Sequence, residues 1–293
     1  MTEEELRRQE EQDLKILKIT DTTHFGGTAI KVFVGTDVNG GCAECQMVFE
    51  YSLRKHSSRP VEIVWMKISE DPASFWHGWN TKDWSTPFSG FRYGIAEFCN
   101  YKGKAIYCDD DQLWLSDPVE LWNTEIPDGK VMTGKLLPNG EVRHCVSLID
   151  CEQWKDQVSV PVQRRKVNNT FVEMMKRITT PLTHIVGDEW NCYDGENMPI
   201  DQIKLLHMTD MATNPGVAMA VKRLGDQSQH WYNGRILEHR RPDVVDTFKQ
   251  HYDEAIAAGY SVSDYISNKK VDYQMLDQSN YVANNGWDVR KGE

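Results

Sequence analysis

The sequence alternates short apolar, β-branched runs with segments of helical periodicity, and this alternation limits the fold more than any other feature. Residues 29–34 predict a strand, a helical pattern follows up to about His56, and residues 61–68 predict a second strand. A helical segment over 91–100 precedes a further strand at 105–108. Strands that alternate with helices in this way predict an α/β fold with a mainly parallel sheet covered by helices.

The second half of the chain continues the pattern less regularly. Residues 142–149 predict another strand, residues 170–178 a helix, and residues 243–258 an amphipathic helix. At 293 residues the chain is long enough for one large α/β domain with a buried core. We expect a charged N-terminal segment over 1–28, the α/β domain over 29–240 and a C-terminal helical extension over 241–293.

Charge and cysteine content narrow the classes of function. A formal net charge of −11 argues against a surface that follows a nucleic-acid backbone, because such a surface needs clustered Lys and Arg in excess. A small anionic ligand stays compatible with this charge, since a divalent cation held by acidic side chains reverses the local field. Seven cysteines, an odd number without a disulfide-scaffold rhythm, predict reduced thiols and a cytoplasmic location.

Hydropathy gives no sign of a membrane segment. The residues from Met1 to Lys15 are charged, and no stretch approaches the ~20 apolar residues of a membrane span. We therefore expect neither a signal peptide nor an integral membrane segment. The basic stretch over 235–241 is compatible with peripheral contact to an anionic membrane surface or with a solvated turn, and we favour the turn.

Three consecutive aspartates follow the strand at 105–108, where ligands of α/β sheets gather. In extended backbone Asp109 and Asp111 share a face while Asp110 points away, which gives an oxygen-rich pair suited to Mg²⁺ or Mn²⁺. Taken alone, the triplet is as compatible with a solvated polar turn. His207 ends another apolar stretch, and as a third ligand it would favour Mn²⁺.

Several segments in chain order carry a family resemblance. They are 31–37 (Lys-Val-Phe-Val-Gly-Thr-Asp), 86–93 (Thr-Pro-Phe-Ser-Gly-Phe-Arg-Tyr), 101–111 (Tyr-Lys-Gly-Lys-Ala-Ile-Tyr-Cys-Asp-Asp-Asp), 117–122, 190–192 (Trp-Asn-Cys) and 205–207 (Leu-Leu-His). Together they resemble glycosyltransferase family 8 over about residues 30–210, most specifically over 86–122. The resemblance implies the GT-A fold, a Rossmann-like sheet flanked by helices, here with a C-terminal helical appendage.

The resemblance also implies roles for individual residues. Asp109, Asp111 and His207 would hold the divalent cation, Mn²⁺ or Mg²⁺. Arg92 would contact the diphosphate or the sugar of the donor, or else be a helix arginine paired with Glu97. Asp188 would contact the sugar or the acceptor, or else belong to a plain turn. The residues implied in binding the nucleotide-sugar are Val34, Gly35, Thr36, Asp37, Arg92, Asp109 and Asp110.

The implied function is transfer of a hexose-type sugar from a nucleoside diphosphate sugar, with UDP favoured, to an acceptor hydroxyl. Family 8 enzymes retain the anomeric configuration, and a glycan, a lipid-linked sugar or a small molecule would each serve as acceptor. Two alternatives stay open. One is a nucleotide-sugar-binding protein with a decayed transferase fold, and the other is a phosphatase of the haloacid dehalogenase class, which uses the first Asp of an Asp-x-Asp motif as nucleophile.

The chain departs from the family pattern near the sugar, where the Asp-Gln-Asp element expected between Trp154 and Trp190 is also absent, and near the diphosphate, which a lysine after the metal-binding histidine normally contacts. Arg143-His144-Cys145 stands where the family shows Asn-x-Gly, and no lysine follows His207 over residues 208–215. Lys222 or Arg223 would have to replace that lysine.

Overall fold

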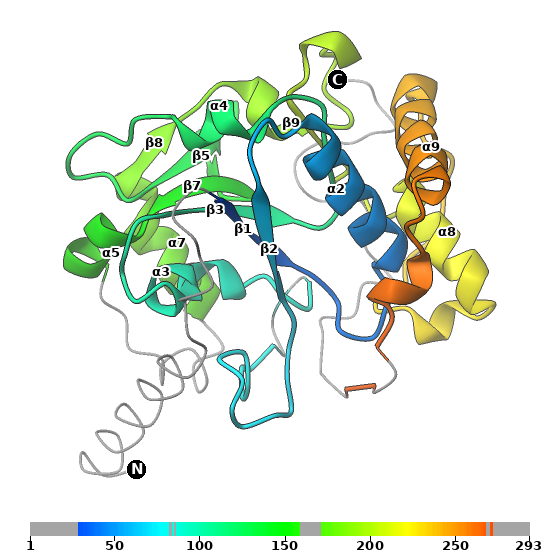
Figure 1. The fold of residues 1–293 in the computed structure, drawn as a ribbon, viewed down its shortest axis with the longest axis horizontal. Helices are drawn as coiled ribbons and strands as arrows, with labels where there is room; N and C mark the ends of the chain where they lie inside the picture. The colour runs from blue at the N-terminus through cyan, green and yellow to red at the C-terminus, as the bar shows by residue number, and fades with distance from the viewer. Residues whose placement is uncertain (1–28, 82–83, 85, 159–170, 268–269, 272–293) are drawn as a thin grey trace.

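The computed structural model describes residues 29–81, 84, 86–158, 171–267 and 270–271, so the charged segment expected over 1–28 lies outside the described residues. A central sheet has the strand order β2-β1-β3-β7-β5-β6, and β8 pairs with β5 (Figure 1). Its strands are β1 (Ile30–Gly35), β2 (Val61–Met66), β3 (Lys104–Asp109), β5 (Met132–Leu136), β6 (Val142–Arg143), β7 (Val146–Asp150) and β8 (Thr183–Ile185).

Strand direction places the carboxyl ends of the first strands at one edge. Strands β1, β2 and β3 are parallel, β5 and β8 run the same way, and β7 and β6 run opposite to their neighbours. Gly35 at the end of β1 lies opposite Met66 of β2 and Asp109 of β3. The predicted α/β fold with a mainly parallel sheet flanked by helices is confirmed.

Helices cover both faces of the sheet, and the alternation of side chains along each strand decides which core they join. Phe33 and Tyr107 join one core, while Val32, Val34 and Ile106 join the other. The first core is closed by α3 (Ile95–Phe98), α5 (Cys151–Gln157) and α7 (Phe171–Thr179), and the second by α2 (Ala43–His56) and α4 (Pro118–Trp122).

An aromatic segment fills the first core beside α3. Trp76, Trp79 and Trp84 are buried there as part of this core. The helix predicted over 91–100 is shorter, because its first turn is a 3-10 helix. The 3-10 turns of the described chain are η2 (Phe91–Gly94), η3 (Thr180–Leu182), η4 (Asp188–Asn191), η5 (Ile200–Gln202), η6 (Gln227–Gln229) and η7 (Val262–Tyr265).

A second, three-stranded sheet lies behind the second core. It has the order β4-β10-β9, with β4 (Gln112–Trp114), β9 (Cys192–Tyr193) and β10 (Leu205–His207). Strand β10 runs antiparallel to β4 with His207 opposite Gln112, and parallel to β9 with His207 opposite Tyr193. Since β4 directly follows the aspartates, this pairing brings His207 next to them.

The strand predicted over 142–149 is interrupted in the structure. Strand β6 ends at Arg143 and β7 begins at Val146, because the two carbonyls between them bond elsewhere. The His144 carbonyl accepts from Arg92 Nη1 at 2.7 Å, and the Cys145 carbonyl accepts from Gln112 Nε2 at 2.9 Å. The backbone carbonyls at the break thus accept hydrogen bonds from side chains that lie around the aspartates.

The amphipathic helix predicted over 243–258 is confirmed as α9 (Pro242–Ala257), and α8 (Pro215–Leu224) precedes it. Residues 272–293 of the expected C-terminal extension lie outside the described residues. Helix α9 packs directly on α2 (Figure 1), where Phe248 and Val244 share a core with Val48. Phe248 is fully buried there. The boundary expected near residue 240 stays a prediction, since these contacts tie α9 to the sheet domain through α2.

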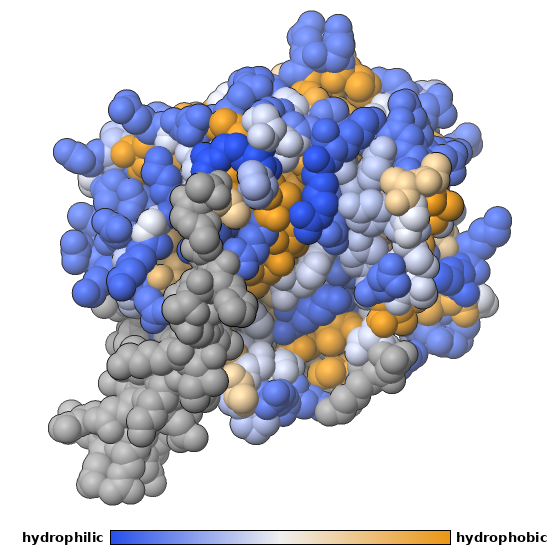
Figure 2. Space-filling view, viewed as in Figure 1, coloured by the Kyte–Doolittle hydropathy of each residue, from blue (hydrophilic) through white to orange (hydrophobic). Residues whose placement is uncertain are grey.

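The surface of the described residues is mixed in character. Figure 2 shows hydrophilic residues over much of one face, with smaller apolar groups between them. No helix in the described part of the chain is both long and apolar enough to cross a membrane. All seven cysteines are free, and six of them are buried, so their thiols are largely shielded from solvent.

We expect Phe248→Ala to lower the free energy of unfolding by about 3–5 kcal/mol, because the truncation removes apolar contacts and leaves a cavity between α9 and α2. Ile256→Ala, at a position of the same helix that is 45% exposed, is the matched control and should change it by about 0.5 kcal/mol. Urea denaturation measures both. Equal small effects would contradict the integration of α9 into the core.

Candidate active site

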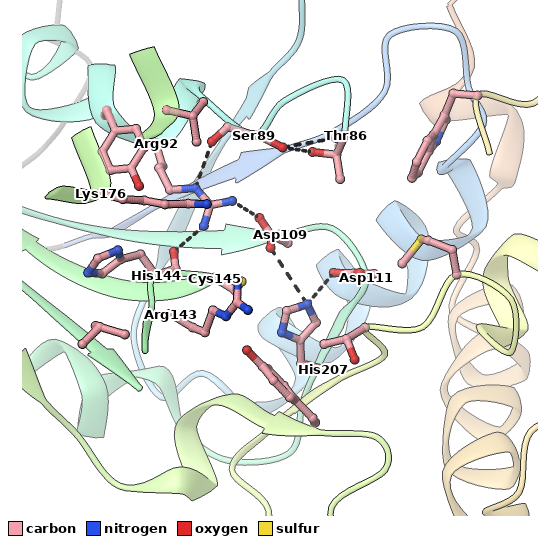
Figure 3. A pocket seen from close by; sticks show the side chains of 17 residues that line it. Thr86, Ser89, Arg92, Asp109, Asp111, Arg143, His144, Cys145, Lys176 and His207 are labelled. Atoms are coloured by element: carbon pink, nitrogen blue, oxygen red, sulfur yellow. Dashed lines mark hydrogen bonds and ion pairs between the residues drawn. The ribbon is translucent and has the colours of Figure 1, made fainter. Parts of the chain in front are cut away.

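A cleft of about 220 Å³, open to solvent, lies at the carboxyl end of β3. Side chains from β3, β6, α7, β9 and β10 line it, together with residues of the loops before α3 and after β10. Asp109, Asp111 and His207 lie close together in this cleft (Figure 3). The structure therefore brings together the three residues that the sequence suggests as cation ligands.

Asp109 is held by two neighbours through one of its oxygens. Oδ1 accepts hydrogen bonds from the Tyr107 hydroxyl and from Arg92 Nη2, the latter at 3.2 Å. The Arg92 guanidinium also lies over the Tyr107 ring, 4.4 Å from its centre. With Oδ1 engaged, Oδ2 of Asp109 turns toward His207, whose Nε2 is 3.9 Å away.

The His207 ring is oriented from its other side. Its Nδ1 donates to the Asn191 amide oxygen at 2.7 Å, and the Tyr193 ring packs against it edge to face at 5.4 Å. With Nδ1 directed at Asn191, Nε2 is the nitrogen that faces the carboxylates, 3.1 Å from Asp111 Oδ1. A histidine whose second ring nitrogen is held by an oxygen acceptor has the arrangement common among metal ligands in proteins.

Asp111 shows that the residues fit a cation. Its Oδ1 is buried and has no hydrogen-bond partner among the described residues, although His207 Nε2 is close. Burial raises the pKa of Asp111, His207 opposes the increase, and Asp109 adds to it. A buried carboxylate without a donor, beside a second carboxylate, is costly unless positive charge compensates it. Two carboxylates and one imidazole match the preferences of Mn²⁺.

The protonation of His207 responds to the same two carboxylates. Burial by itself lowers the pKa of His207, but Asp111 and Asp109 outweigh it, so the pKa lies above its ordinary value. A proton on Nε2 and a divalent cation would both balance these carboxylates, and they compete for the same space. Cation binding at this place therefore displaces a proton.

Cys145 is a neighbour of the site that the sequence does not single out. Its sulfur lies within 4.8 Å of ligand atoms of Asp109 and His207, so these three form an alternative donor set. Burial, with a further contribution from Asp109, raises the pKa of the Cys145 thiol to about 12. A protonated thiol is a poor ligand for Mg²⁺ or Mn²⁺, so Asp111 is the better third donor for a hard cation.

Arg92 lies in the cleft, but its guanidinium is already used by the protein. Nε donates to the Ser89 carbonyl at 3.2 Å, Nη1 to the His144 carbonyl, and Nη2 to Asp109. The alternative pairing with Glu97 is not what holds it. Arg92 is thus placed to fix Asp109 and the loop at 144, and its predicted contact with a donor stays a prediction.

The residues at the end of β1 are covered in this structure. Val34, Gly35, Thr36 and Asp37 are all buried and do not line the cleft. The Asp37 carboxylate accepts from the Gly41 backbone N–H at 2.6 Å. These residues can therefore contact a nucleotide only if the side chains that cover them move.

Asp110 points away from the cation ligands, as expected, and accepts a hydrogen bond from the Thr36 hydroxyl. It lines a much smaller adjoining cavity of about 30 Å³, which shares Asp109, Asp111 and Trp231 with the cleft. Burial raises the pKa of Asp110 well above its ordinary value, and Asp111 adds to the increase.

A loop after α8 packs against the turn that follows β1. His230 contacts the Gly41 carbonyl at 2.8 Å, and the Trp231 indole N–H donates to Cys42 at 3.3 Å. Trp231 lines both cavities, yet no sequence pattern indicated this. A local sequence pattern does not show this contact, because it joins segments that are far apart in the chain.

Asp188 is not brought to the cleft. It begins the 3-10 turn η4, its side chain is 62% exposed, and it lies 3.7 Å from Lys135 Nζ. The same turn directs Trp190 and Asn191 inward, where both are buried. A turn that buries its last two residues leaves its first in solvent, which explains the position of Asp188.

The two candidates for the missing lysine also lie elsewhere. Arg223 pairs with Glu44 at 2.6 Å and donates to the Gly40 carbonyl, and Lys222 lines a separate groove between α8 and α9. The basic side chains that do line the cleft besides Arg92 are Arg143 and Lys176. Lys176 lies on a helix that the sequence predicts, but nothing in the sequence distinguishes it as a residue of the cleft.

Comparisons with known proteins give a structural likeness only. No family model and no curated protein matches the sequence. The structure is similar to the bifunctional glycosyltransferase WbbM (TM-score 0.51, 12% identity, 67% of this chain and 50% of that chain). It is also similar to the glycosyltransferase GlyE of Streptococcus pneumoniae TIGR4, in one structure with a TM-score of 0.52, 13% identity, and coverage of 84% of this chain and 67% of that chain. In the apo form of GlyE the values are 0.51, 14%, 79% and 64%.

These likenesses show that the chain has the fold of these glycosyltransferases. The chain spans half of the WbbM chain and about two thirds of the GlyE chains. The identities are low, so the comparison concerns architecture.

We expect Asp111→Asn to abolish the stabilisation of the protein by Mn²⁺, because it removes one of the two carboxylates that face His207 Nε2. Asp128→Asn, at an exposed aspartate outside the cleft, should respond to Mn²⁺ as the unmodified protein does. Melting temperatures with and without Mn²⁺ measure the effect. Equal stabilisation of both variants by Mn²⁺ would place the cation elsewhere.

Asn191→Ala should weaken Mn²⁺ binding about tenfold or more, because it frees the Nδ1 side of His207 and with it the direction of Nε2. Asn191→Asp keeps an oxygen acceptor at this place and should retain more of the affinity than alanine. Calorimetric titration of Mn²⁺ gives both values. Unchanged affinity in Asn191→Ala would show that His207 does not need this contact to bind.

Proposed function

We propose that the chain is a metal-dependent glycosyltransferase related to family 8, which transfers a hexose-type sugar from a nucleoside diphosphate sugar to an acceptor hydroxyl. The observation that carries the proposal is the cluster of Asp109, Asp111 and the oriented His207, in an open cleft at a strand end. The glycosyltransferase fold of the chain and the family 8 motifs add support. Mn²⁺ is the favoured cation and UDP the favoured nucleotide.

A divalent cation bound there would stabilise negative charge on the departing diphosphate. The chain's own residues prepare the place. Arg92 and Tyr107 hold Asp109 so that Oδ2 faces the cleft, and Asn191 holds His207 so that Nε2 does. This fixed arrangement removes the need to order the ligands during the reaction, which is how a preorganised site lowers a barrier.

The carboxylates that line the cleft, within the described residues, are those of Asp109 and Asp111. Both lie in the proposed cation site, so we propose no carboxylate nucleophile. The family resemblance supports retention of the anomeric configuration. For the phosphatase alternative, Asp109 would have to attack phosphorus, whereas its Oδ1 is held by Arg92 and Tyr107.

We place the nucleoside toward the smaller cavity under Trp231 and the sugar toward the open side of the cleft. The two cavities meet at Asp109 and Asp111, so a diphosphate on a cation there would extend into both. Donor contact with Thr36 and Asp37 requires a movement that exposes these buried residues. The altered residues Arg143 to Cys145 and the absence of a lysine over 208–215 are the observations that favour the alternative of a binding protein with a decayed site.

Turnover separates these two functions. The purified chain should release UDP from a UDP-sugar in the presence of Mn²⁺, and Asp111→Ala should lower that rate by about a hundredfold or more, because one ligand of the charge-stabilising cation is lost. Asp128→Ala is the control. UDP release is measured with a coupled assay.

A panel of nucleotide sugars identifies the donor. With Mn²⁺ present, the correct donor at about a hundred times its Kd should raise the melting temperature by about 5 °C or more. A shift without turnover would establish the binding-protein alternative. No shift with any nucleotide sugar would overturn the proposed function.

A further inference from the structure

Two basic side chains line the cleft beyond the proposed cation site. Arg143 comes from β6 and Lys176 from α7, and Figure 3 shows both side chains extending into the region around His144 and Cys145. Both positions lie within the cleft lined by Asp109 and Asp111. They are candidates for a ligand contact that the proposed reaction does not yet explain.

Their present partners lie at the surface. Arg143 pairs with Glu141 at 2.8 Å, and Lys176 pairs with Glu173 at 2.7 Å. The side chains of Glu141 and Glu173 are 57% and 72% exposed and do not line the cleft. Exposed pairs of this kind contribute little to stability, so either basic group can exchange its partner for a ligand at low cost.

Among the described residues that line the cleft, no negative side chain is left to compensate the charges of Arg143 and Lys176. The negative side chains among its described lining residues are Asp109 and Asp111, and a divalent cation would balance both. Arg92 donates to Asp109 and two carbonyls. With Arg92, Arg143 and Lys176, the cleft then has three positive charges, one more than the two negative charges of a bound diphosphate.

The neighbouring histidine, His144, adds no positive charge to this balance. His144 is buried, and burial, together with Arg92 and Lys176, lowers its pKa to about 3. Its Nε2 contacts the Thr183 hydroxyl at 2.8 Å, so its ring is part of the wall. The basic character of this side of the cleft therefore comes from Arg143 and Lys176.

We propose that Arg143 and Lys176 form a subsite for an anionic group, a carboxylate or phosphate carried by the transferred sugar or by the acceptor. This inference rests on the proposed function and names the substrate class of the same cleft. A guanidinium binds such a group with two parallel hydrogen bonds, and an ammonium adds a point charge. A neutral hexose would need neither.

The test compares matched ligands on the full chain with Mn²⁺. In the first arm, UDP-glucuronic acid is compared with UDP-glucose, which differ in one carboxylate. In the second arm, UDP is bound first and glucose 6-phosphate is compared with glucose. The proteins are the unmodified chain, Arg143→Gln/Lys176→Gln, the charge-conserving Arg143→Lys, and Arg177→Gln as the control at an exposed neighbour on α7.

The unmodified chain should bind the anionic ligand about tenfold or more tightly than its neutral partner in one arm. The first arm assigns the anion to the donor sugar, and the second assigns it to the acceptor. The double variant should lose this preference, Arg143→Lys should keep part of it, and Arg177→Gln should keep all of it.

Two results would overturn the subsite. One is the absence of a preference in both arms, and the other is an equal loss of affinity for UDP alone in the double variant, which would assign the pair to the diphosphate. Binding of UDP with Mn²⁺ by the unmodified chain is read separately. Its failure would reject the proposed function, whereas its success with no anion preference would reject the subsite alone.

Discussion

The pairing of β10 with β4 is the constraint on which the site depends. The register sets His207 opposite Gln112, directly after the aspartates, and the Met208 N–H donates to the Asp111 carbonyl at 3.0 Å. A shift by one residue would turn the imidazole to the other face of the small sheet, because side chains alternate along a strand. The chemistry of the cleft is therefore fixed by main-chain pairing between segments far apart in the sequence.

The second constraint is the compensation of buried negative charge. Asp109, Asp110 and Asp111 are all at most 9% exposed, and each meets a different neighbour. Arg92 and Tyr107 hold the first, the Thr36 hydroxyl donates to the second, and the third faces His207. Of these three aspartates, Asp111 is the one with a buried oxygen that has no hydrogen bond within the described part of the chain, so added positive charge gains most there.

Local sequence patterns predicted many of the strands and helices, because each pattern depends on residues within a single element. Periodicity located β1, α2, β2, β3, α7 and α9, and the strand end located the aspartates. The strand over 142–149 was wrong as a single element, because the carbonyls at its centre bond to Arg92 and Gln112, which no local pattern encodes. The outward turn of Asp188 likewise follows from the burial of Trp190 and Asn191.

Contacts over long sequence distance could not be predicted in this way. Trp231 contacts the turn after β1 through Cys42, and Lys176 reaches the cleft from α7. The position of His207 was suggested by family resemblance, whereas the orientation of its ring by Asn191 needed the structure. The side of the cleft beyond the cation site is thus where the sequence carries least information, and it is where we propose that substrate choice is decided.

Anomalous diffraction from crystals soaked with Mn²⁺ tests the central claim most directly, since it locates the ion without reference to activity. The account predicts one strong peak within coordination distance of Asp109, Asp111 and His207 Nε2. A peak bound by Asp109, Cys145 and His207 without Asp111, or a peak outside the cleft, would contradict it.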